Sequence, residues 1–68
     1  MTLKKALKKA LKNNHKWVAC DVDGELYSYS KKPKYHTCGY WSHEKAKEKF
    51  IGTYSEKKIS KGFLKKVK

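Results

Sequence analysis

The segment KWVACDVDGELYSYS, residues 16–30, carries the clearest structural pattern in this sequence. Lys16 to Val22 and Glu25 to Ser30 each have the composition of a β-strand. The Asp23-Gly24 dipeptide between them is typical of the two-residue type I′ turn, in which both central residues adopt positive φ. We therefore predict an antiparallel hairpin here, and a small sheet built around it.

A two-residue turn also fixes which side chains share a face of the hairpin. It pairs Val22 with Glu25, Cys20 with Tyr27, and Val18 with Tyr29. This largely apolar face is expected to turn toward the core. The opposite face is mixed and is expected to be partly exposed; it carries Trp17, Ala19, Asp21, Leu26 and Ser28.

Residues 1–14 predict a basic amphipathic helix. Thr2 is suited to the N-cap and Asn13-Asn14 to a C-terminal stop. At helical spacing, one face carries Leu3, Ala6, Leu7, Ala10 and Leu11, and the other carries Lys4, Lys5, Lys8, Lys9 and Lys12. Because so short a helix is not stable alone in water, its apolar face is expected to dock on the sheet.

The rest of the chain predicts shorter elements. Pro33 ends the hairpin, since proline cannot continue a central ladder. The expected elements are then a loop over 35–38, a short strand over 39–41, a helical turn capped by Ser42 and running to Lys47 or Glu48, a strand over 50–54, and a turn over 55–59. In the lysine-rich residues 61–68, Phe63, Leu64 and Val67 fit either a last strand or loose packing.

These elements predict one small α+β domain over residues 1–68. A short basic N-terminal helix (1–14) packs on a three- to four-stranded antiparallel sheet built around the Asp-Gly hairpin. The sheet core spans 16–54, and a basic tail spans 55–68. A small sheet with a mixed second face can also pair with itself, so both a monomer and a homodimer fit the sequence.

Charge is the strongest functional signal. The 68 residues include eighteen lysines, no arginine and only six acidic side chains, for a formal net charge of +12. Such a field favours polyanionic partners: nucleic acid, an anionic membrane or an acidic protein surface. Lysine lacks the planar fork with which arginine grips guanine edges, so contacts to a phosphate backbone are expected rather than base readout.

Size and pattern weigh against other classes of function. So short a chain has little room for a deep enzyme pocket, and no nucleophile with a base and an orienting group stands out. We expect neither an enzyme nor a cofactor. No apolar run approaches a membrane span or a secretory signal, so a cytoplasmic protein with free thiols at Cys20 and Cys38 is expected. A single disulfide between these cysteines stays an alternative.

The central segment resembles a group of short bacteriophage-encoded accessory proteins. Their shared pattern is Trp-x-Ala-x-Asp-x-Asp-Gly, then aromatic-x-aromatic, Lys-Pro, a tryptophan and a closing Ile/Leu-Gly strand. Here it corresponds to Trp17 through Gly24, Tyr27 and Tyr29, Lys32-Pro33, Trp41, and Ile51-Gly52. The resemblance covers about residues 16–54 and implies a small antiparallel sheet and a setting in the cytoplasm of an infected bacterium. It implies no particular activity.

Two binding hypotheses follow. The first is non-specific binding of nucleic acid, with lysines on the phosphates and aromatic rings available for stacking. The second is a host-takeover protein that binds and inhibits an acidic host protein through an aromatic and basic surface. The candidate residues for either are Lys4, Lys5, Lys8, Lys9, Lys12, Lys31, Lys32, Lys34, Tyr40 and Trp41, with the lysines of 57–68 beside the second basic group.

Two further possibilities have weaker support. The repeated Leu-Lys-Lys-Ala of the helix is a cationic amphipathic pattern, but docking on the sheet explains it as well, so membrane binding is not expected. Metal binding would have to use Cys20, His36, Cys38 and His43. These residues lack the paired-cysteine spacing of zinc sites, so no metal is expected.

Overall fold

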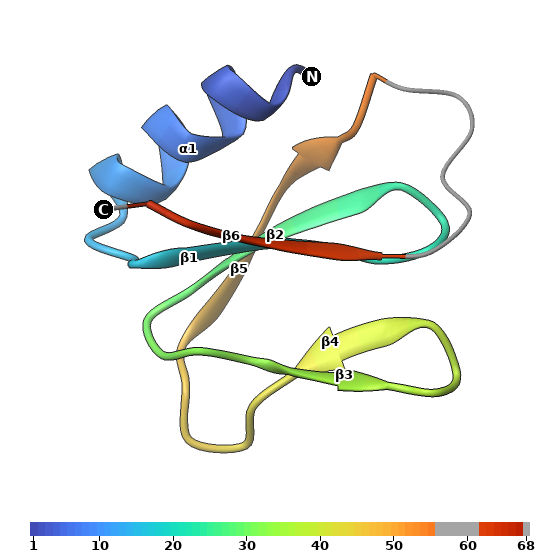
Figure 1. The fold of residues 1–68 in the computed structure, drawn as a ribbon. Helices are drawn as coiled ribbons and strands as arrows, with labels where there is room; N and C mark the ends of the chain where they lie inside the picture. The colour runs from blue at the N-terminus through green and yellow to red at the C-terminus, as the bar shows by residue number, and fades with distance from the viewer. Residues whose placement is uncertain (56–61, 68) are drawn as a thin grey trace.

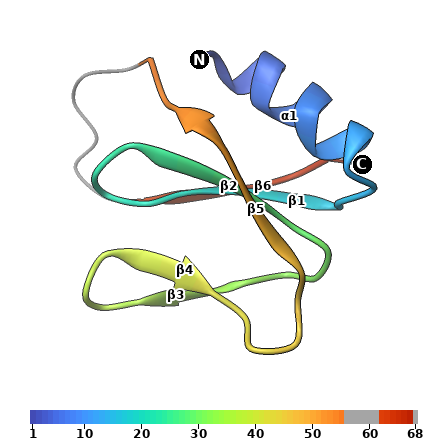
Figure 2. The ribbon, with the colours of Figure 1, turned by 180° about the vertical axis from the view of Figure 1, so that it is seen from behind.

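The computed structural model describes residues 1–55 and 62–67. One helix, α1 (Leu3–Lys12), is followed by strands β1 (Trp17–Cys20), β2 (Glu25–Tyr29), β3 (Lys34–His36), β4 (Tyr40–Ser42), β5 (Glu48–Thr53) and β6 (Phe63–Lys66). Four strands form an antiparallel sheet in the order β5-β2-β1-β6, and β3 pairs with β4. In Figures 1 and 2, α1 lies on one side of the four-stranded sheet and the β3–β4 hairpin on the other. The predicted α+β class is confirmed.

The helix forms where its caps and its apolar face predict it. The Thr2 side chain accepts a hydrogen bond from the Lys5 backbone N–H at 3.2 Å, and Asn13 is the C-cap that follows Lys12. Asn14 follows with φ of 58°, the left-handed conformation that asparagine tolerates. Ala6 and Ala10 are fully buried and pack in the core with Val18, Cys20, Leu26 and Ile51. Alanine at these two positions lets the helix backbone approach the sheet closely.

The predicted register of the β1–β2 hairpin is wrong by one residue. Cys20 pairs with Leu26 and Val18 with Ser28. The Asp21 N–H donates to the Glu25 carbonyl at 3.0 Å, and the Gly24 N–H donates to the Asp21 carbonyl at 2.9 Å. The strands are therefore joined by three residues, 22–24, instead of two.

The conformation of Gly24 explains this register. A type I′ turn would require positive φ at Asp23 as well as at Gly24. Among the described residues Asn14 is the only non-glycine with positive φ, whereas Gly24 has φ of 90°. The three-residue loop confines the left-handed conformation to glycine, where it carries no steric cost.

The shifted register exchanges the β2 residues between the faces. Leu26 and Ser28 share the helix side with Val18 and Cys20, whereas Tyr27 and Tyr29 turn to the side of the β3–β4 hairpin. In β5 the pairing with β2 is irregular beside Leu26 and Tyr27. Ile51 is buried in the core, and Phe50 meets the Tyr27 ring at 5.4 Å between ring centroids. The two sides of the sheet therefore differ in chemistry: the fully buried core side chains that face α1 are small or aliphatic, whereas Tyr27 and Tyr29 face the β3–β4 hairpin.

Other local predictions need correction. Residues 34–36 are strand β3 instead of loop. In place of the predicted helical turn, residues 43–46 form a single β-turn, in which the Ala46 N–H donates to the His43 carbonyl at 3.2 Å. β5 begins earlier than predicted. The sheet also continues past residue 54, because β6 pairs with β1 as the last-strand alternative predicts. Most of the turn predicted over 55–59 lies outside the described residues.

The β3–β4 hairpin is attached to the sheet through Trp41. The indole N–H of Trp41 donates to the Cys20 carbonyl at 3.1 Å, and its backbone N–H donates to the Asp21 carboxylate at 3.0 Å. The Tyr29 hydroxyl donates to the Trp41 carbonyl at 2.8 Å. These three bonds connect β4 to both strands of the β1–β2 hairpin and hold the β3–β4 hairpin against the sheet.

Candidate functional site

The outer face of α1 is a continuous basic surface. Lys4, Lys5, Lys8 and Lys12 are exposed, and the helix carries no acidic residue. With a rise of about 1.5 Å per residue, the stretch from Lys5 to Lys12 spans roughly 10 Å. Because Ala6 and Ala10 are buried against the sheet, α1 cannot rotate about its axis to bury these lysines without exposing the two alanines. The sequence predicted this face correctly.

Lys9 lies at the flank of this face. Its Nζ donates to the Ile51 carbonyl at 3.2 Å and so connects α1 to β5. A shallow cavity of about 200 Å³ beside it is lined in part by Lys12 and Lys49. Lys49, which the sequence did not single out, joins the basic surface because the β2–β5 register brings it to the helix side opposite Ser28.

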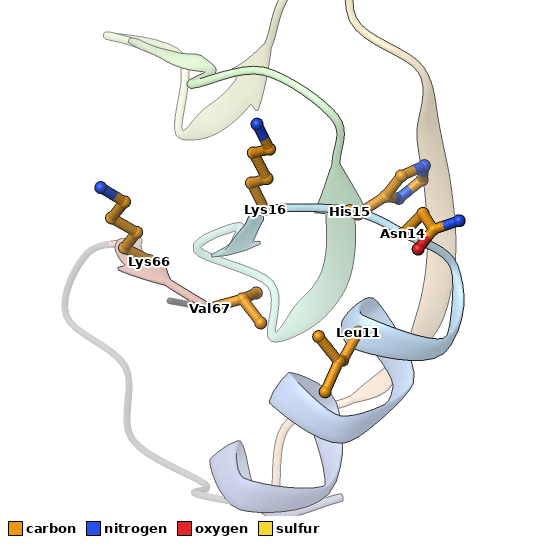
Figure 3. Close-up of a pocket in the computed structure, with 6 residues that line it drawn as sticks. All are labelled: Leu11, Asn14, His15, Lys16, Lys66 and Val67. Carbon is orange, nitrogen blue, oxygen red and sulfur yellow. The ribbon is translucent and has the colours of Figure 1, made fainter.

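A larger open cavity, of about 420 Å³, lies at the other flank, between the end of α1 and β6. Figure 3 shows Leu11 and Val67 side by side there, with Lys16 and Lys66 extending away from them. The Val67 N–H donates to the Lys16 carbonyl at 2.8 Å, which holds the two chain segments together. Lys16 was missed by the sequence reasoning, since only the β1–β6 pairing brings it to this surface.

The second predicted basic group contacts the Trp17 ring through one of its lysines, Lys32. Lys31, Lys32 and Lys34 are exposed. The Nζ of Lys32 lies 5.7 Å from the centroid of the Trp17 ring, and the Nζ of Lys66 lies 5.9 Å from it. Lys57, Lys58, Lys61 and Lys68 lie outside the described residues. The indole thus brings together lysines from the β2–β3 connection and from β6.

The two predicted aromatic contacts differ in their surroundings. Tyr40 is 44% exposed, and its ring stacks on His36 with 4.4 Å between centroids. Trp41 is partly buried, packs against the Tyr35 ring at 5.0 Å, and uses its indole N–H inside the molecule. Tyr40 is therefore available to a partner, whereas Trp41 contributes mainly to holding β4 in place.

The four predicted metal-ligand candidates are not brought together. Burial, and then the neighbouring Asp21, raise the pKa of the Cys20 thiol to about 11, so this side chain stays protonated at neutral pH. Cys38 is exposed, and both cysteines are free. His36 pairs with the Ser42 hydroxyl at 2.5 Å, and the His43 ring accepts the Lys45 N–H at 3.0 Å. Each of the four thus has its own local environment.

Acidic side chains gather at the β1–β2 connection. The carboxylates of Asp21, Asp23 and Glu25 can lie within 4.8 Å of one another. Burial raises the pKa of Asp21 despite the hydrogen bond from Trp41, and the Asp23 charge raises the pKa of Glu25. Negative charge therefore concentrates at the connection between β1 and β2.

Asp21→Asn is expected to unfold at an equal or higher urea concentration than the natural protein. A raised pKa means that the folded state binds the proton more tightly, so ionised Asp21 lowers stability at neutral pH and this cost disappears as the pH falls through its pKa. Asparagine removes the charge and keeps an oxygen for the Trp41 N–H. Asp21→Ala removes that acceptor too and is expected to lower the free energy of unfolding by about 1–3 kcal/mol. Equal loss in both variants would contradict this account.

Within the described residues, no helix is long and apolar enough to cross a membrane. Comparisons of the chain with protein-family models, with curated proteins and with solved structures found no match. Its function is therefore inferred from the placement of its own residues.

Proposed function

We propose that this protein binds nucleic acid non-specifically, through contacts between the lysines of α1 and backbone phosphates. The observation that carries the proposal is the docking of α1 by its buried Ala6 and Ala10, which holds Lys4, Lys5, Lys8 and Lys12 on one exposed face. Because the fold already holds α1 as a helix, binding does not carry the entropic cost of forming it.

The charges beside α1 widen this interface. Lys49 extends it on the β5 side, next to Lys9 and Lys12. Lysine ammonium groups are point charges that recognise phosphates without reading bases. Binding is therefore expected to depend little on nucleotide sequence and strongly on salt.

Lys5, Lys8 and Lys12 changed together to Gln are expected to weaken binding to a labelled 20-base-pair duplex about tenfold or more at 50 mM salt, since each removes a phosphate contact. Glutamine keeps the helix propensity of lysine, so α1 should stay folded. Fluorescence anisotropy measures the affinity, with two unrelated duplexes to test sequence independence.

The matched control changes Lys34, Lys45 and Lys47 to Gln. These exposed lysines lie on β3 and on the connection between β4 and β5, and the control removes the same number of charges. It is expected to lower the affinity much less than the helix variant. Equal losses would mean that binding follows net charge alone, and the assignment to α1 would be wrong.

Binding to an acidic host protein is the second candidate function. The exposed rings favour it, because Tyr35, Tyr40 and Phe50 are 42%, 44% and 50% exposed and aromatic side chains are enriched in protein interfaces. Capture of one stoichiometric protein from nuclease-treated bacterial lysate, lost on Tyr40→Ala, would favour it over nucleic acid. In both cases the resemblance to phage proteins suggests action in the cytoplasm of an infected bacterium.

A further inference from the structure

An open cavity of about 380 Å³ lies on the side of the sheet opposite α1, between β2, β5 and β4. Four of its lining residues are aromatic and two are acidic; the full lining is Asp21, Tyr27, Tyr29, Tyr40, Trp41, Ser42 and Glu48. None of these residues is a lysine. In a chain with a net charge of +12, this is an unusual local composition.

The walls of the cavity are held in place by the fold. Tyr27 and Tyr29 alternate along β2 and so point to the same side of the sheet, and the register sets Glu48 of β5 opposite Tyr29. The Tyr27 ring packs edge to face against the ring of Phe50, its partner on β5. Trp41 is fixed by its bonds to Cys20, Asp21 and Tyr29. The cavity therefore exists before any ligand arrives.

Electrostatics in the cavity favour a positive ligand. Burial, followed by the charges of Glu48 and Asp21, raises the pKa of the Tyr29 hydroxyl. Burial also raises the pKa of Asp21, and the charges of Asp23 and Glu48 add to that shift. In both groups the neighbouring carboxylates add to the effect of burial on the pKa, and a cation bound between Asp21 and Glu48 would offset their charges.

We propose that this cavity binds an organic cation that carries an alkylammonium or methylated ammonium group. The carboxylates of Asp21 and Glu48 supply the opposite charge, and the aromatic lining supplies surface that attracts ammonium ions through the ring quadrupole. Ca²⁺ or Mg²⁺ fits less well, since these ions take six or more oxygen ligands and most of this lining is carbon. The volume is at the small end of the roughly 300–1,000 Å³ typical of ligand pockets, which suits one such group.

The test is a titration of the whole protein, followed by ¹H–¹⁵N NMR, with choline at constant ionic strength. The indole N–H of Trp41 and the amides of Tyr27 and Tyr29 are expected to shift and to saturate in the millimolar range. The matched neutral compound is 3,3-dimethylbutan-1-ol, which has the shape of choline without its charge. It is expected to cause no saturable shift.

Variants locate the site. Glu48→Gln is expected to weaken choline binding about threefold to tenfold, because it removes one of the two carboxylate charges that face the ammonium group. Because Glu48 is exposed, the variant should stay folded, which the dispersion of the same spectra verifies. Glu44→Gln removes an equal charge from an exposed residue outside this cavity and is expected to bind choline as the natural protein does.

The source of the ammonium group is distinguished by a second titration, with the amide of N-acetyl-lysine. Tighter binding than choline would identify a lysine side chain of a partner as the ligand, and weaker binding a free quaternary amine; either result supports a cation site. Saturation by the neutral alcohol, equal effects of Glu44→Gln and Glu48→Gln, or no saturable shift with either cation would overturn the proposal.

Discussion

Ala10→Asp is expected to leave the chain largely unfolded at 25 °C. Ala10 is fully buried between α1 and the sheet, in a cluster with Val18, Leu26 and Ile51 that offers no partner for a carboxylate. An unpaired charge in such surroundings costs several kcal/mol. A chain of this length has a free energy of unfolding of roughly 3–10 kcal/mol, so the cost of the buried charge is comparable with the total stability.

Lys8→Asp is the control for this variant. It introduces the same residue into the same helix at an exposed position, where only helix propensity and local charge change. Urea unfolding followed by circular dichroism should show a midpoint close to that of the natural protein for Lys8→Asp and no folded baseline for Ala10→Asp. Two similar midpoints would mean that α1 is not docked, and the lysine face would then lack its support.

Trp41→Ala is expected to lower the free energy of unfolding by about 3 kcal/mol or more, from lost packing and a lost hydrogen bond. The side chain contacts the Tyr35 ring and donates to the Cys20 carbonyl. Trp41→Phe keeps an aromatic ring but loses the indole N–H donor, so it is expected to lower the free energy of unfolding by about 1 kcal/mol. Urea titration of both variants measures these differences.

Tyr40→Ala provides the comparison at the neighbouring position. The Tyr40 ring is 44% exposed, so its removal is expected to cost much less than that of Trp41. If Trp41→Ala and Tyr40→Ala lower the stability equally, Trp41 does not hold the β3–β4 hairpin on the sheet. The aromatic cavity would then also lack its fixed wall.

The helix was predictable because its evidence is local. Thr2, the spacing of Leu3, Ala6, Leu7 and Ala10, and the terminal asparagines all lie within one short segment. The register of the β1–β2 hairpin was not predictable, since Asp-Gly fits both a two-residue turn and a three-residue loop that ends in a left-handed glycine. One residue of difference moved Leu26 into the core and Tyr27 out of it.

The candidate sites likewise have a part that local sequence patterns predict and a part that depends on long-range pairing. The basic face of α1 follows from helical periodicity, so the sequence predicted it. The flanking positions of Lys16 and Lys49 depend on the β1–β6 and β2–β5 pairings, which join residues far apart in the chain. The bonds of Trp41 to Cys20 and Asp21 are likewise long-range. No local pattern marks such contacts, and the aromatic cavity is built from them.

The salt dependence of duplex binding is the most direct test of phosphate binding by α1. Affinity is measured between 50 and 200 mM salt for the natural protein and for the Lys5, Lys8 and Lys12 to Gln variant. The logarithm of the affinity should fall linearly with the logarithm of salt concentration, and the variant's slope should be shallower by about 0.9 for each lysine that contacts a phosphate. Equal slopes for the two proteins, or binding that does not respond to salt, would contradict phosphate binding by α1.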